Sequence, residues 1–82
     1  MGDWPGRGHG LSPREGEILA LIGQGLTNDD IARQLFLSIN SVKTYIRSAY
    51  RKIGVTRRTE AVLWFVDHGF TREEHRTFLA HP

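Results

Sequence analysis

The stretch "SINSVKTYIRSAYRKIGV", residues 38–55, decides the fold of this chain. It contains four Lys or Arg residues and no carboxylate. Its apolar residues recur at spacings of four, three and four, which places them in one stripe along an α-helix. They are Val42, Ile46, Ala49 and Ile53. The pattern predicts a helix with a buried apolar face and an exposed basic face, capped by Ser38 and ended by Gly54.

Two capping motifs predict further helices ahead of this stretch. In "SPRE", Ser12 is the N-cap, a proline fills the first helical position, and Glu15 completes a capping box. Apolar residues then recur at helical spacing until Gly25 offers a stop. In "TNDD", Thr27 and Asp30 repeat the capping device at the start of a shorter helix.

The rest of the chain adds a fourth helix and a tail. The segment "RTEAVLWFVDH", residues 58–68, precedes Gly69, which predicts a helix that stops there. The segment "TREE" is a weaker capping box that could open a short fifth helix. No alternating strand pattern competes with these helices, so the sequence predicts an all-α protein.

The predicted domain covers residues 11–70. Residues 1–10, "MGDWPGRGHG", are rich in glycine and show no periodicity, so we expect a flexible arm or a cloning remnant there. Residues 71–82 form a C-terminal tail with the possible fifth helix. No receiver or ligand-sensing domain fits before residue 11, so the sequence suits either the effector part of a larger regulator or a stand-alone one.

Composition excludes several classes of protein. The 82 residues suit one small domain, and the absence of cysteine excludes disulfides and thiolate metal sites. No apolar run approaches the roughly 20 residues that span a bilayer, and the N-terminus lacks a secretory signal. The four histidines lack metal-ligand spacing, and no nucleophile has a partnered base. We therefore expect a soluble cytoplasmic protein without enzymatic activity, metal or cofactor.

Positive charge is concentrated in the middle of the chain. Seven Lys and Arg residues lie between Ile31 and Thr59, and no Asp or Glu does, although the net charge is only +2. A one-sided field of this kind attracts polyanions. A solvated basic face is the alternative explanation of the same pattern.

The second and third predicted helices, joined by a short turn, suit a helix-turn-helix unit. Once the apolar stripe faces inward, Lys43, Thr44 and Arg47 share the outward face. Lys and Arg donate to guanine edges in the major groove, and a Thr methyl contacts the thymine methyl. We assign these three residues to base edges, and Arg51 and Lys52 to phosphates.

Residues 11–62, "LSPREGEILALIGQGLTNDDIARQLFLSINSVKTYIRSAYRKIGVTRRTEAV", resemble the LuxR-type helix-turn-helix domain. This module is the DNA-binding part of quorum-sensing regulators and of the NarL/FixJ branch of response regulators. The resemblance implies a four-helix domain that binds two-fold-related DNA sites as a dimer through its fourth helix. It gives Lys43, Thr44 and Arg47 the base-reading role, and Tyr45 stands where the family usually has His. The expected phosphate contacts are Thr27, Asn28, Ser41, Tyr45, Arg51 and Lys52.

The fourth helix carries its own indication of a dimer. The run "AVLWFV", residues 61–66, is apolar on every side, whereas a surface helix of a small domain needs one apolar stripe. We expect Leu63, Trp64 and Asp67 to face a second copy of the chain. The alternative is that the C-terminal tail folds back and covers them.

Two rival functions are weighed against DNA binding. A helix-turn-helix of a sigma-factor-like fragment would dock on RNA polymerase as well as on promoter DNA. A membrane-surface helix would need bulky residues along its apolar face, and Ala49 in the stripe suits helix packing better. The sequence therefore predicts a DNA-binding transcriptional regulator, with a module that docks on RNA polymerase as the alternative.

Overall fold

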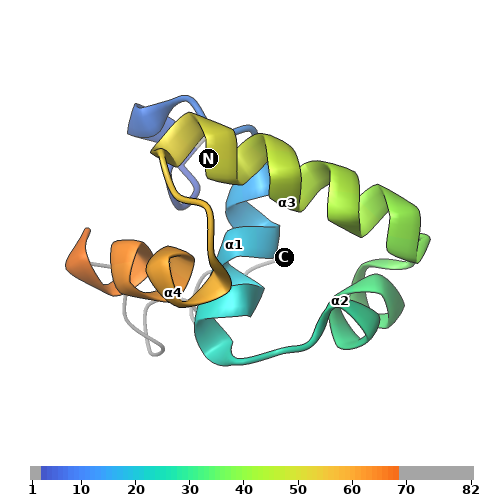
Figure 1. Cartoon of the computed structure of the whole chain (residues 1–82). Coiled ribbons are helices and arrows are strands. Elements are labelled where there is room, and N and C mark those ends of the chain that lie inside the picture. Colours follow the sequence, from blue (N-terminus) through green and yellow to red (C-terminus); the bar gives the residue numbers. More distant parts are fainter. Residues whose placement is uncertain (1–2, 69–82) are drawn as a thin grey trace.

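The computed structural model describes residues 3–68, which form four α-helices and one short 3-10 helix (Figure 1). The 3-10 helix η1 spans Arg7–His9, α1 spans Pro13–Gln24 and α2 spans Asn28–Leu35. Helix α3 spans Ile39–Ile53 and α4 spans Arg58–Asp67. No strand occurs among these residues, so the all-α prediction is confirmed. The predicted fifth helix falls in residues 71–82, outside the described part of the chain.

The hydrogen bonds of the two predicted capping boxes are present in the structure. The Ser12 hydroxyl accepts from the backbone N–H of Glu15 at 3.1 Å, and Glu15 Oε1 accepts from the Ser12 N–H at 2.8 Å. Thr27 and Asp30 form the same reciprocal pair at the start of α2. Helix α1 ends at Gly25, whose φ of 99° is the left-handed conformation that glycine adopts without steric cost.

The turn between α2 and α3 contains one strained residue. Phe36 ends α2 with a φ of 57°, in the left-handed region that non-glycine residues rarely enter, and its side chain is 94% exposed. The Leu37 N–H then donates to the Ala32 carbonyl at 2.9 Å, and Ser38 caps α3. The chain therefore passes from one helix to the next in three residues, as a helix-turn-helix requires.

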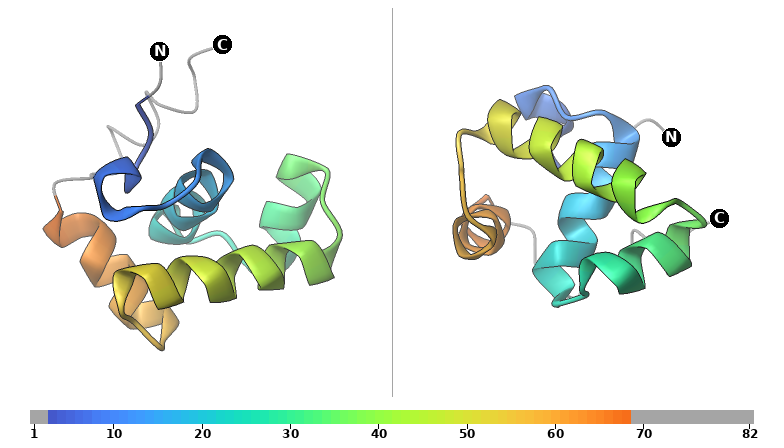
Figure 2. Two further views of the ribbon diagram at one scale, coloured as in Figure 1. Left: turned by 90° about the horizontal axis from the view of Figure 1, so that it is seen from above. Right: turned by 45° about the vertical axis from the view of Figure 1, so that its right-hand side comes forward.

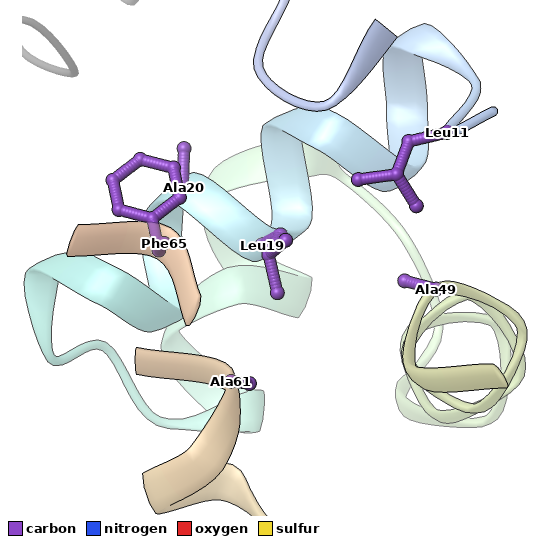
Figure 3. Packing of buried hydrophobic residues seen from close by; sticks show 6 residues of the cluster. All are labelled: Leu11, Leu19, Ala20, Ala49, Ala61 and Phe65. Carbon is purple, nitrogen blue, oxygen red and sulfur yellow. The ribbon is translucent and has the colours of Figure 1, made fainter. Parts of the chain in front are cut away.

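Helix α1 is the centre of the molecule, and α3 and α4 pack on it from different sides (Figures 1 and 2). The close-up in Figure 3 shows Leu19 of α1 between Ala49 of α3 and Ala61 of α4. Phe65 of α4 lies beside Ala20 in the same cluster. A Cβ at Gly23 would lie 2.7 Å from the Phe65 ring, so glycine there permits the close approach of α4.

A second cluster holds the helix-turn-helix together. The buried residues Ile18, Leu21 and Ile22 of α1 meet one residue from α2 and one from α3, which are Ile31 and Val42. Of the predicted α3 stripe, Val42 and Ala49 are buried, and Ile46 and Ile53 are half-buried against the core. The stripe is therefore confirmed as the inner face of α3.

The segment ahead of α1 differs from the expected flexible arm over residues 3–10. The Trp4 indole N–H donates to the Leu11 carbonyl at 2.8 Å, and Pro5 and Gly6 are buried. A Cβ at Gly16 would lie 2.2 Å from the Pro5 carbonyl oxygen, so Pro5 lies directly on α1. Glycine within α1, unfavourable for an isolated helix, is what permits this contact.

Candidate nucleic-acid interface

The outward face of α3 carries the residues assigned to base reading. Lys43, Thr44 and Arg47 are exposed, on the side of the helix away from the buried Val42 and Ala49. The Thr44 hydroxyl donates to the Asn40 carbonyl at 3.0 Å, one turn back on the same helix. Side-chain rotation at Thr44 is therefore restricted, with its hydroxyl proton already bound to the backbone.

Positive charge on this face has no partner within residues 3–68. Lys43, Arg47 and Arg51 are exposed and form no ion pair with any residue in that range. The sequence expectation of an exposed basic face on α3 thus matches the structure. These cations are available to an external anion without breaking a contact inside the domain.

Lys52 is in a different position from its neighbour Arg51. Its ammonium lies 2.8 Å from Glu15 Oε1, and the Glu15 side chain is only 6% exposed. The Lys52 side chain is 42% exposed, so its remaining N–H donors still reach solvent. Sequence reasoning assigned Lys52 to a phosphate and missed this ion pair, because 37 residues separate the partners and no local pattern connects them.

The Glu15 carboxylate is a buried charge with several donors. Burial by itself would raise the pKa of Glu15, but hydrogen bonds from Lys52, from the Ser12 N–H and from Ser48 outweigh burial. They hold the pKa at about 2, against 4.5 for an ordinary glutamate. The capping role predicted for Glu15 is confirmed, and the same carboxylate also ties α1 to the last turn of α3.

The start of α2 offers polar groups on a separate element. Thr27 is exposed and its hydroxyl serves as the cap, while Asn28 is half-buried. Hydrogen bonds with Thr27 and with Arg33, whose guanidinium lies 2.6 Å away, lower the pKa of Asp30. The negative charge of Asp30 is therefore balanced by Arg33 beside it.

Two further residues assigned to phosphates lie at the edge of the exposed face. Ser41 is half-buried, and its hydroxyl oxygen accepts from the Ser38 hydroxyl at 3.0 Å. Tyr45 is half-buried and its ring packs against the second core cluster. Both side chains therefore already make contacts inside the domain.

The face of α4 expected to meet a second copy is only partly exposed. Leu63 is 61% exposed and Asp67 is exposed, but Trp64 is half-buried against the first core cluster. The Trp64 ring stacks on His68 with centroids 4.1 Å apart, and His9 meets it edge-on at 5.1 Å. Val66, which sequence reasoning did not single out, is 55% exposed. Leu63 and Val66 are therefore the large apolar residues that α4 presents to solvent.

A shallow hollow lies on the same helix, lined by Arg58, Thr59, Val62 and Leu63. Within residues 3–68, no three His, Asp or Glu side chains are grouped so that they could hold a metal ion. No helix of this part of the chain is both long and apolar enough to cross a bilayer.

Four helices, a three-residue turn and a basic exposed α3 define a small helix-turn-helix DNA-binding domain. The chain belongs to the luxR family of bacterial regulatory proteins, whose family model matches residues 9–65. The resemblance drawn from the sequence is therefore confirmed. The family is one of DNA-binding transcription regulators and not of enzymes.

Named relatives agree with this assignment. The "Probable csgAB operon transcriptional regulatory protein" of Salmonella typhimurium is 47% identical over 58 residues, which cover 71% of this chain and 27% of the relative. "Response regulator Rre1" of Synechocystis is 42% identical over 61 residues, covering 74% and 26%. "HTH-type transcriptional regulator MalT" of Yersinia pestis is 46% identical over 52 residues, covering 63% and 6%. The chain thus spans about a quarter of the length of the first two relatives.

Proposed function

We propose that this domain reads duplex DNA by placing α3 in the major groove and binds two-fold-related sites as a dimer. The observation that carries the proposal is the exposed face of α3, where Lys43, Thr44 and Arg47 lie together without ion pairs to the rest of residues 3–68. A helix fits the major groove, and these residue types have partners on guanine and thymine edges.

Phosphate contacts would fix the register of α3 in the groove. Arg51 is the cation best placed for this role, because it is exposed and follows Arg47 by one turn. Thr27 and Asn28, at the start of α2, would contact a second stretch of backbone. Ser41, Tyr45 and Lys52 have partners inside the domain, so a phosphate would share them with those partners.

The dimer would form through the exposed side of α4. Leu63 and Val66 are large apolar residues with more than half of their surface in solvent, and the hollow beside Leu63 could receive an apolar side chain. Asp67 lies at the edge of this surface and Trp64 contributes through its exposed part. A two-fold axis through α4 would give each copy one half-site. Since such a regulator acts on chromosomal DNA, the bacterial cytoplasm is its proposed location.

The first test is selection of binding sites from a randomised duplex pool at near-physiological salt. The proposal expects a recovered site with two related halves. On that site, Arg47→Ala should lose about 1–3 kcal/mol and relax the choice at one base position. Arg14→Ala, which removes the same charge from α1, is the matched control. If Arg47→Ala lost the same affinity for the recovered site as for random DNA, Arg47 would contact a phosphate and not a base.

The alternative function is a protein-interaction module that docks on RNA polymerase. In that case Phe36, whose side chain is 94% exposed at the helix-turn-helix turn, would lie in the protein contact. Salt separates the two functions. A domain that neutralises about six phosphates loses affinity with a log–log slope of about −5, whereas an apolar protein interface is nearly insensitive to salt.

A further inference from the structure

Arg58, the first residue of α4, reaches back to the beginning of α2. One end of its guanidinium donates to the backbone carbonyl of Leu26, in the loop between α1 and α2. Nη1 makes a long hydrogen bond of 3.4 Å to Oδ1 of Asn28. A guanidinium can hold two acceptors at a fixed angle, which a lysine ammonium cannot reproduce. One side chain therefore ties α4 both to the loop and to the first residue of α2.

This contact determines how the Asn28 amide is turned. An asparagine amide has one acceptor oxygen and an NH₂ group with two donors. Because a guanidinium only donates, it pairs with Oδ1 and leaves Nδ2 on the other side of the amide. Within residues 3–68, Nδ2 of Asn28 donates to no other residue. At the start of α2, Arg58 therefore fixes the orientation of the Asn28 side-chain amide, and the NH₂ group of that amide donates no hydrogen bond within residues 3–68.

We propose that Arg58 is a positioning residue for a DNA-phosphate contact made by Asn28. The inference rests on the proposed function, in which the start of α2 contacts the DNA backbone. Neutral side-chain amides are common donors to phosphate oxygens, and a contact from a held amide loses less conformational entropy on binding. In this role Arg58 acts through Asn28 and does not itself neutralise a phosphate.

The test is a double-mutant cycle on the duplex recovered by site selection, with affinity measured over a series of salt concentrations. The variants are Arg58→Met, Asn28→Ala and the two combined. Arg57→Met is the matched control, because Arg57 is exposed, adjacent in sequence, and its side chain makes no ion pair within residues 3–68. It measures the loss that follows from removing one positive charge at this end of α4.

Positioning predicts three results together. Arg58→Met weakens binding about fivefold beyond the Arg57→Met control, the equivalent of about one neutral hydrogen bond. The slope of affinity against salt is the same for both Arg variants. In the Asn28→Ala background, Arg58→Met has little further effect, because the group that it positions is gone.

Other results would overturn the inference. A salt slope reduced by about 1 relative to Arg57→Met would make Arg58 itself a phosphate ligand. Full additivity of the Arg58 and Asn28 losses would make the two residues independent. Arg58→Lys keeps the charge but not the fork, so positioning predicts a loss like that of Arg58→Met, and recovery of wild-type affinity would contradict it.

Failure of the proposed function looks different from failure of this inference. If wild-type protein does not bind the duplex, or if Asn28→Ala binds it as tightly as wild type does, Asn28 makes no phosphate contact. The positioning role of Arg58 is then excluded as well. If Asn28→Ala weakens binding and the Arg58 variants do not, only the positioning role is excluded. Thermal unfolding of each variant identifies a loss of fold, and Arg58→Lys supplies the test if Arg58→Met unfolds.

Discussion

Replacing Glu15 by glutamine should reveal how strongly one buried ion pair stabilises the domain. Glutamine has nearly the same volume and keeps an oxygen that can accept from the Ser12 N–H. It removes the negative charge that faces the Lys52 ammonium at 2.8 Å. The substitution therefore isolates the ionic part of the contact between α1 and α3.

The magnitude follows from the pKa of Glu15. A pKa of about 2 in the folded state, against 4.5 in an unfolded chain, corresponds to about 3 kcal/mol of stabilisation at pH 7. Since the Lys52 side chain is 42% exposed and partly solvated, about 2–3 kcal/mol is the expected loss for Glu15→Gln. The ionised form is the stabilising one, so its contribution is complete above pH 4.5 and disappears as pH falls towards 2. At pH 3 about 1 kcal/mol of it should remain.

Urea unfolding followed by far-UV circular dichroism, from pH 7 to pH 3, measures this contribution. The difference in free energy of unfolding between wild type and Glu15→Gln should shrink as pH falls, while Glu17→Gln should stay within about 0.5 kcal/mol of wild type. Glu17 is the control because its ion pair with Arg14, at 3.0 Å, lies near the surface of the same helix. A difference that is below about 0.5 kcal/mol at pH 7, or that does not change with pH, would refute the reasoning.

Three other substitutions test separate features. Gly16→Ala should lower the melting temperature by about 4–8 °C, because its Cβ would lie 2.2 Å from the Pro5 carbonyl oxygen. In a chain that lacks residues 1–10 this clash is absent, so the same substitution should raise the melting temperature through the higher helix propensity of alanine. Phe36→Gly should raise the free energy of unfolding by up to about 1 kcal/mol, since glycine adopts a φ of 57° without strain; a clear loss in urea titrations would mean that the ring packs. Leu63→Glu should weaken binding to a two-fold DNA site but not to a single half-site, with circular dichroism unchanged; equal losses on both probes would place Leu63 outside the dimer surface.

The helices and their ends could be predicted because their determinants are local. Ser12, Thr27 and Ser38 cap helices through groups three residues away, and Gly25 and Gly54 end helices through their own φ angles. Such contacts form within one turn and depend little on the rest of the fold. The exposed basic face of α3 was predictable for a related reason, since the buried stripe of α3 leaves Lys43, Thr44 and Arg47 on the outer side of the helix.

Contacts between distant segments could not be predicted in the same way. The ion pair of Lys52 with Glu15 and the contact of Arg58 with Leu26 join residues more than 30 positions apart. Trp64 was assigned to the outside of α4, but a helix that is apolar on every side does not indicate which side packs inward. In the structure, contacts with His9 and His68 hold its ring beside the first core cluster.

The sequence by itself determined the four helices, the N-caps of the first three, the helix-turn-helix and the basic face of α3, because hydrophobic period and capping act over a few residues. Only the tertiary structure decided which basic residues are already paired, which side of α4 is exposed, and that Trp4 and Pro5 pack on α1. The sequence signal of this packing was Gly16, a glycine inside a helix where a residue of higher helix propensity is favoured. Its meaning required the position of the Pro5 carbonyl, which depends on how the chain folds back on itself and not on any local pattern.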